Sequence, residues 1–90
     1  MTKQDWISYL DSIGARYREY DNDGELEQIY VYSKDEYDKK QAHPRKYKNL
    51  YVPYIRLSHF DDFRVYTREN GVTGYEGNDR VKRIIERDYI

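Results

Sequence analysis

The sequence predicts an α+β domain, in which a four- to five-stranded antiparallel sheet carries an N-terminal and a C-terminal helix on one face. Two observations predict this fold. Apolar residues recur at helical spacing near both ends of the chain, and between these ends they alternate with tyrosine and arginine at the two-residue period of a strand. A chain of 90 residues builds one small core, so we expect a single domain over residues 1–90.

The first helix is expected over Lys3–Ile13. Thr2 is a favourable N-cap, and Trp6 and Leu10 recur on one side together with further isoleucines. Gly14 is a typical residue for ending a helix. This helix should place an apolar stripe on the sheet.

The strands alternate in polarity and are separated by turn residues. Asp21-Asn22-Asp23-Gly24 and Glu69-Asn70-Gly71 are typical of hairpin turns, because Asn, Asp and Gly tolerate a left-handed backbone. We expect strands over Ala15–Tyr20, Leu26–Ser33, Tyr51–His59, Phe63–Arg68 and Val72–Tyr75.

A basic helix-loop insertion at about residues 34–49 is expected between the second and third strands. Ser33 and Glu36 form a Ser-x-x-Glu capping box, which predicts a short helix over Lys34–Gln41, and His43-Pro44 should end it. The insertion carries a secondary basic patch formed by Lys39, Lys40, Arg45, Lys46 and Lys48.

The last helix is expected to begin at a cap provided by Asn78 or Asp79. Its apolar residues should point toward the core, and they are Val81, Ile84, Ile85 and Tyr89.

The alternation along the strands separates two kinds of side chain. An apolar set should pack beneath the terminal helices and consists of Ile29, Val31, Ile55, Leu57, Phe63 and Val65. The opposite set, which we call the Tyr/Arg face, consists of Arg16, Arg18, Tyr20, Tyr30, Tyr32, Tyr54, Arg56, Arg64, Tyr66 and Arg68.

The Tyr/Arg face indicates an interaction surface, because tyrosine and arginine offer a large contact area and directed hydrogen bonds with few rotamers to immobilise. The leading hypothesis is a non-enzymatic module that binds a protein partner, as an inhibitor or regulator of a larger host complex. Short, cysteine-free chains rich in tyrosine and charge are similar in composition to small phage and mobile-element proteins, many of which act in this way. The same pattern is also typical of an ordinary solvated sheet, in which cross-strand Tyr and Arg pairs add stability.

Other partners are compatible with the same residues. Single-stranded nucleic acid would stack its bases on the tyrosines and place its phosphates near the arginines and the basic patch. Self-association through the face would give a homodimer. The net charge of −1 and the pI near 6.1 argue against a simple duplex-binding protein, a class that is usually strongly basic.

Catalytic and cofactor signatures are weak. His59, Asp61 and Asp62 offer one imidazole and two carboxylates to a divalent metal, which leaves a nuclease-like site as a second alternative. The sequence contains no nucleophile elbow and no phosphate-binding glycine loop, so we expect neither an enzyme nor a bound cofactor. The absence of cysteine and of long apolar runs leads us to expect a cytoplasmic protein that does not enter a membrane.

Overall fold

Helices lie near both ends of the chain, and strands fill most of the part between them. A computed structural model describes residues 1–21, 26–61, 63–69 and 72–90. Within these residues the order is α1 (Lys3–Ser12), β1 (Arg16–Asp21), β2 (Glu27–Tyr32), α2 (Lys34–Ala42), β3 (Tyr54–Ser58), β4 (Arg64–Glu69), β5 (Val72–Gly77) and α3 (Asn78–Asp88).

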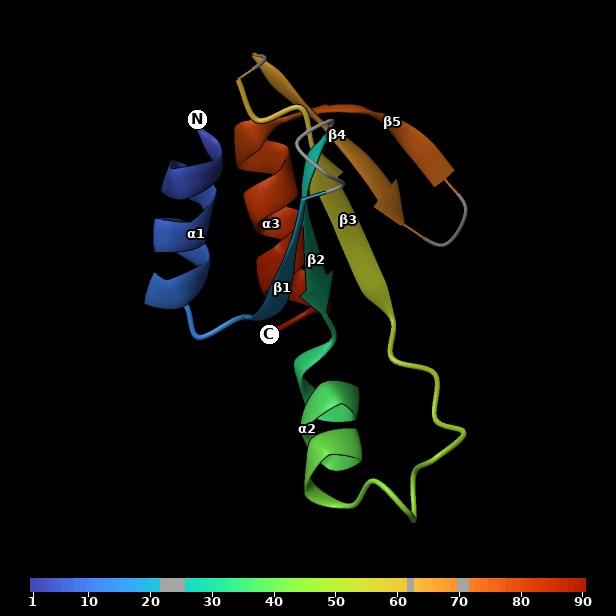
Figure 1. The fold of residues 1–90 in the computed structure, drawn as a ribbon. Coiled ribbons are helices and arrows are strands. Elements are labelled where there is room, and N and C mark those ends of the chain that lie inside the picture. Colours follow the sequence, from blue (N-terminus) through green and yellow to red (C-terminus); the bar gives the residue numbers. More distant parts are fainter. Residues whose placement is uncertain (22–25, 62, 70–71) are drawn as a thin grey trace.

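The five strands form one open sheet in the order β1-β2-β3-β4-β5, and each neighbouring pair is antiparallel (Figure 1). The predicted α+β class and antiparallel sheet are therefore confirmed. Each strand lies beside the next strand in the chain, including β2 and β3, which are joined through α2 and its loop. Most of the Asp21-to-Gly24 turn, and the Asn70-Gly71 turn, lie outside the described residues.

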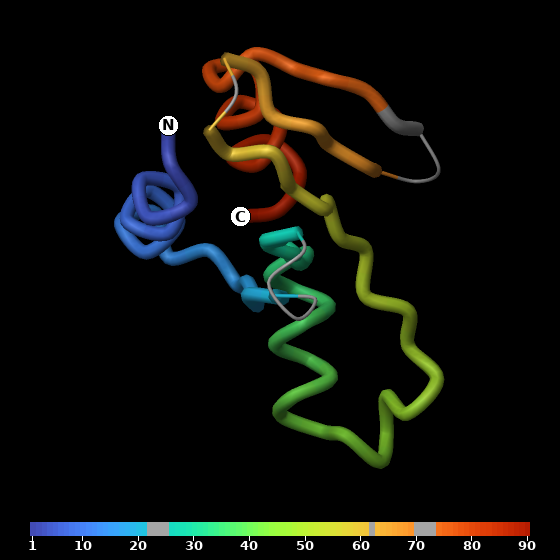
Figure 2. Tube along the Cα trace, turned by 45° about the horizontal axis from the view of Figure 1, so that its top comes forward, coloured from blue at the N-terminus to red at the C-terminus, as the bar shows by residue number. Residues whose placement is uncertain are grey.

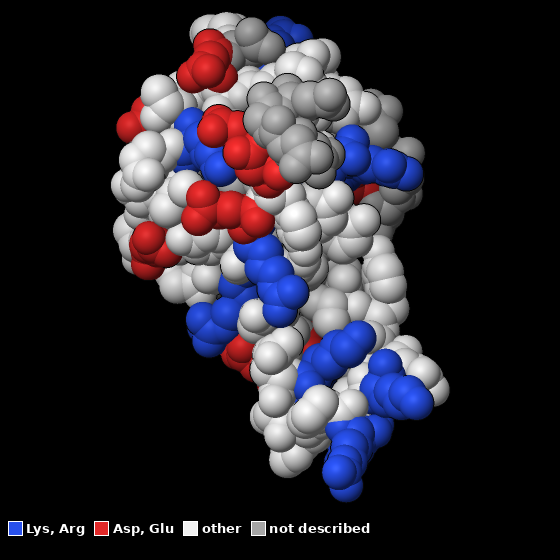
Figure 3. Space-filling view, in the orientation of Figure 1, with Lys and Arg blue, Asp and Glu red and all other residues white. Residues whose placement is uncertain are grey.

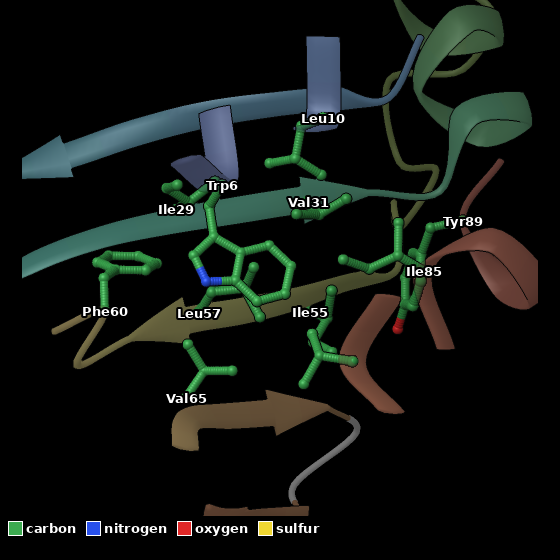
Figure 4. Close-up of a cluster of buried hydrophobic side chains, with 11 residues drawn as sticks. Trp6, Leu10, Ile29, Val31, Ile55, Leu57, Phe60, Val65, Ile85 and Tyr89 are labelled. Carbon is green, nitrogen blue, oxygen red and sulfur yellow. The ribbon is translucent and has the colours of Figure 1, made fainter. Parts of the chain in front are cut away.

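The core lies between one face of the sheet and the two terminal helices. Trp6 and Leu10 of α1 and Val81 and Ile85 of α3 are fully buried, and they share one cluster with the apolar strand residues (Figure 4). The remaining buried members of the cluster are Ile29, Val31, Ile55, Leu57, Phe60, Val65 and Tyr89. Both helices thus pack on the same side of the sheet, as the sequence predicts.

A capping box fixes the start of α1. The Thr2 hydroxyl accepts a hydrogen bond from the Asp5 backbone N–H at 3.2 Å, and the Asp5 carboxylate accepts one from the Thr2 N–H at 2.9 Å. These bonds stabilise the ionised carboxylate and lower the pKa of Asp5. Gly14 follows the helix with φ of 69°, a conformation that glycine adopts without steric cost.

The prediction that Phe63 belongs to the core is wrong. Its side chain is 88% exposed, and Phe60 is buried in its place. The alternation of β4 begins only at Arg64, and the preceding chain turns at His59, whose φ is 62°. Phe63 precedes the first residue of β4, so the two-residue period of that strand does not determine the direction of its side chain.

Two predicted caps also differ from the structure. Gly77 is the N-cap of α3 and makes no side-chain capping bond, so neither Asn78 nor Asp79 fills that position. At α2, Ser33 is the N-cap as predicted, but its hydroxyl donates to the Glu36 carboxylate and forms no side-chain bond to the helix backbone. This contact is the main cause of the lowered pKa of Glu36.

The α2 helix and the loop that follows it project beyond the sheet, away from α1 and α3, in both views of the chain (Figures 1 and 2). Two backbone hydrogen bonds hold the base of this segment, from Ser33 N–H to Pro53 O at 2.8 Å and from Lys34 N–H to Tyr89 O at 3.2 Å. Over the described ranges, none of the helices has the length and apolar character needed to cross a membrane.

Candidate functional site

The strand register places all ten residues of the Tyr/Arg face on the side of the sheet opposite α1 and α3. Side chains that are paired directly across antiparallel strands point to the same side. Three cross-strand rows contain all but one of the ten, and they are Arg16–Tyr32–Tyr54, Arg18–Tyr30–Arg56–Arg68 and Tyr20–Gln28–Ser58–Tyr66–Tyr75. Arg64 lies two residues before Tyr66 in β4, so it shares the same side.

Charge is segregated between the two sides of the sheet. The strand carboxylates are all on the side of the helices. Glu19, Glu69 and Glu76 pair with the core residues Ile29, Ile55 and Val65, Glu27 lies two residues before Ile29, and Asp21 pairs with Glu27. Within the described strand residues, the Tyr/Arg face holds five arginines and no acid. In Figure 3, lysine and arginine also concentrate at the lower end, over α2 and the loop that follows it.

Only one of the five arginines has a carboxylate partner within the described part of the chain. Arg16 donates from Nε to Asp38 Oδ1 at 2.7 Å and from a terminal nitrogen to Oδ2 at 3.3 Å, which joins β1 to α2. This pairing lowers the pKa of Asp38 and raises that of Arg16. The other four arginines of the face form no ion pair with a described residue.

Arg56 occupies the centre of the face in an unfavourable setting. It lies directly opposite Arg68, and like charges at such positions are destabilising. Its Nε is buried without an acceptor among the described residues, and its guanidinium lies 6.0 Å from the Tyr66 ring centroid. An anion on this surface would offset the repulsion between the Arg56 and Arg68 guanidinium groups.

The tyrosines over β1, β2 and β3 pack against one another. Tyr20 and Tyr30 lie 4.5 Å apart between ring centroids, and Tyr30 stacks on Tyr54 at 4.9 Å with an interplanar angle of 11°. The hydroxyls of Tyr20 and Tyr32 lie within hydrogen-bonding distance at 3.3 Å. Burial is the main cause of the raised pKa of Tyr32, and the contact with Tyr20 raises this pKa further.

A second aromatic group covers β4, β5 and the end of β3. The Tyr66 and Tyr75 rings meet edge to face at 5.3 Å, and His59 lies 5.6 Å from each of them. Tyr75, which is 49% exposed, was not predicted as part of the face. Its parity in β5 and its position opposite Tyr66 are the signals that would have identified it.

A groove of about 300 Å³ lies where the Tyr/Arg face meets the projecting segment. The face contributes Arg18, Tyr32 and Tyr54, α2 contributes Tyr37, Lys40 and Gln41, and the loop contributes Leu50, Tyr51 and Val52. Sequence reasoning included neither Tyr37 nor the loop residues in the site. The apolar run Leu50–Val52 after a strongly basic segment was the available signal.

The secondary basic patch is largely exposed on the projecting segment. Lys40 is the exception, because its ammonium donates to the Leu50 carbonyl at 3.1 Å and so ties α2 to the loop. Lys46 lies 5.3 Å from the Tyr47 ring centroid. Four of the five cations therefore remain available to solvent or to a partner.

The alternative metal site gains no support from the geometry. Asp62 lies outside the described residues, and among those that the structure does describe no group of three or more His, Cys, Asp or Glu is arranged to hold a metal ion. The His59 Nδ1 is 3.0 Å from the Ser58 hydroxyl, and its ring packs on Tyr66 and Tyr75. His59 thus takes part in the aromatic group.

A second hollow, of about 580 Å³, lies on the helix side of the sheet and contains charges of both signs. Its lining residues are Glu69, Arg80, Arg83, Ile84 and Arg87. Arg80 pairs with Glu76, and Arg87 pairs with Asp88. This hollow is therefore close to electrically neutral, unlike the Tyr/Arg face.

No protein-family model, curated protein or solved structure matches this chain. The function is therefore inferred from the surface itself.

Asp38→Asn is expected to loosen α2 and the groove while the sheet stays folded. The Arg16 guanidinium holds the pKa of Asp38 below its ordinary value of 3.8, so the pair contributes fully above that value and its contribution is lost as the pH falls through the lowered pKa. Hydrogen exchange of α2 amides should be faster in Asp38→Asn than in wild type at neutral pH, and this difference should disappear when the two proteins are compared at one pH below the lowered pKa of Asp38. Asp35→Asn on the same helix is the control, and equal acceleration in both variants would contradict the role of the pair.

Proposed function

We propose that this protein is a non-enzymatic interaction module that binds an acidic protein surface through the Tyr/Arg face and so inhibits or regulates a larger host complex. One observation carries the proposal. The side of the sheet that α1 and α3 leave uncovered bears five arginines and, among its described strand residues, no carboxylate.

The energetics of the free chain support an anionic partner. Arg56 opposite Arg68, together with the buried Arg56 Nε without an acceptor, disfavours the isolated fold. A local departure from the rules of stability is expected where function requires it. Carboxylates from a partner would neutralise this row and form charge-assisted hydrogen bonds with it.

The tyrosines favour a protein over a nucleic acid as the source of these anions. A base needs an open ring face on which to stack. Here Tyr30 already stacks on Tyr54, and Tyr32 stacks on Tyr37 at 5.5 Å, so neighbouring tyrosines occupy ring faces that bases would use. Ring edges and hydroxyls suit the mixed apolar and hydrogen-bonding contacts of a protein interface.

Self-association through the Tyr/Arg face is disfavoured. A two-fold dimer sets the same patch against itself. Guanidinium rows would then face guanidinium rows, because the described strand residues of this face include no carboxylate and Asp38 of α2 is already paired with Arg16. We therefore place the carboxylates on a different protein.

Single-stranded nucleic acid is the second candidate, and one observation favours it. Tyr51 follows Lys48 of the basic patch by three residues, is 65% exposed and offers a ring to a base. Under this alternative, binding would centre on the loop and fall steeply with salt.

Titration of the labelled chain with an acidic protein domain, polyglutamate and oligothymidylate separates the two candidates. We expect the acidic protein and polyglutamate to bind and Arg56→Met/Arg68→Met to weaken both at least about tenfold, since each lost charge-assisted contact costs about 1.5–3 kcal/mol. The matched control, Arg80→Met/Arg83→Met, removes two charges from the opposite side and should bind as wild type does.

Two outcomes would contradict the proposal. Equal losses of affinity in the two double variants would mean that binding depends only on the number of positive charges and that the Tyr/Arg face is not a specific binding surface. Preferential binding of oligothymidylate, weakened by Tyr51→Ala, would establish the nucleic-acid alternative instead.

A further inference from the structure

We propose that the groove between α2 and the sheet receives one large apolar side chain, aromatic or leucine-like, from an acidic segment of the partner. This inference rests on the proposed function and adds the partner's chemistry at one position. The partner segment would place its anchor against Leu50, Tyr51 and Val52 of the loop, with a neighbouring carboxylate on Arg18.

The lining of the groove is apolar at its walls and cationic on one side. Tyrosine rings and the side chains of Leu50 and Val52 supply apolar surface, and no carboxylate of a described residue lines the groove. Apolar walls with a few directed polar groups are typical of a site that binds a side chain or a small ligand. The volume of about 300 Å³ suits a single large side chain.

The number of available cations favours a peptide over a phosphodiester strand at this position. Lys40 lines the groove, but its ammonium is held by the Leu50 carbonyl at 3.1 Å. Arg16, at the same end of the sheet, is paired with Asp38. Arg18 is exposed and contacts the hydroxyls of Tyr37 and Tyr20 but no carboxylate among the described residues, so its charge remains uncompensated for one incoming carboxylate.

Contacts on three sides hold the groove in shape before a partner arrives. The Arg16–Asp38 pair fixes α2 to β1, and the bond from Ser33 N–H to Pro53 O fixes the loop to the end of β2. The Tyr32 and Tyr37 rings stack across the boundary between sheet and helix. A pocket that is already formed loses little conformational entropy on binding, which favours its use as an anchor site.

Fluorescence anisotropy with designed peptides tests the inference on the full chain. Two labelled acidic peptides have equal length and charge and differ only in a central tryptophan or alanine, and labelled oligothymidylate is the third probe. We expect the tryptophan peptide to bind about tenfold or more tightly than the alanine peptide, because a buried aromatic anchor typically dominates such an interface.

Tyr51→Ala should abolish this preference for tryptophan, and its exposure means that the fold should survive the change. Phe63→Ala is the matched control, because it removes another exposed ring that does not line the groove. Circular dichroism of both variants confirms that each remains folded.

Each outcome has a distinct meaning. If both peptides bind equally and the binding depends on Arg56, the groove inference is overturned and the proposed function stands. If neither peptide binds at low ionic strength, both are overturned. If oligothymidylate binds in preference to the peptides and loses affinity in Tyr51→Ala, the groove serves a nucleobase and the inference is again overturned.

Discussion

Arg56→Met is expected to weaken binding of an acidic protein ligand about 10- to 100-fold while the free chain keeps its stability or gains a little. The loss in binding corresponds to one charge-assisted hydrogen-bonded contact of about 1.5–3 kcal/mol. Methionine retains much of the apolar stem that packs on the sheet, so the change removes mainly the charged group.

Stability should not fall, because the charged group is poorly accommodated in the free chain. The substitution removes a buried Nε without an acceptor among the described residues and separates no ion pair there. It also removes the like-charge pairing with Arg68. Together these effects should change the free energy of unfolding by about zero to +1 kcal/mol, in the direction of greater stability.

Opposite effects on binding and stability distinguish an interaction residue from a structural one. Urea denaturation and titration with the acidic ligand measure the two quantities on the same samples. Arg83→Met serves as the control, because Arg83 lies on α3 and also has no ion-pair partner among the described residues. If Arg56→Met destabilised the fold by more than about 1 kcal/mol, its role would be structural, as in an ordinary solvated sheet.

Trp6→Ala is expected to have the largest effect on stability. Trp6 is fully buried and joins α1 to the sheet, and truncation of a buried tryptophan costs about 3–5 kcal/mol. Small domains have a total stability of about 5–15 kcal/mol, so the variant should lose a large part of its folded population.

Trp6→Phe is expected to cost much less than Trp6→Ala. Phenylalanine keeps most of the ring contact, and it removes an indole Nε1–H that is buried without an acceptor among the described residues. Phe63→Ala, at an exposed position, should lie within about 0.5 kcal/mol of wild type.

Chemical denaturation followed by far-ultraviolet circular dichroism measures all three variants, since the protein's single tryptophan is absent from two of them. A shift for Trp6→Ala no larger than that for Phe63→Ala would mean that α1 does not complete the core.

Particular residues show where sequence reasoning succeeded. Ile29, Val31, Ile55 and Leu57 are buried on one side of the sheet, and their neighbours in the strands lie on the other. A one-residue slip would expose every buried side chain of a strand, so the alternation strongly constrains which residues share a side.

Other residues show where it failed. Phe63 fits the expected alternation, but it lies outside β4 and is exposed. Phe60 is buried in the core after a backbone turn at His59, which the local sequence does not predict. Tyr37 and Tyr51 meet the Tyr/Arg face only because α2 and its loop fold back beside Tyr32 and Tyr54. Tyr37 is close in sequence to Tyr32, and Tyr51 is close to Tyr54, but these two pairs come together in one groove only through the path of the loop between α2 and β3.

The sequence by itself determined that the strands have an apolar side and a tyrosine-arginine side, because side-chain direction in a strand follows directly from the two-residue period. Only the tertiary structure decided the order of the strands, the pairing of Arg16 with Asp38, the position of Arg56 opposite Arg68 and the groove beside α2. These features depend on which strands become neighbours and on where a projecting helix meets the sheet. The distances between the residues concerned are set by packing across the whole molecule and cannot be read from a local sequence pattern.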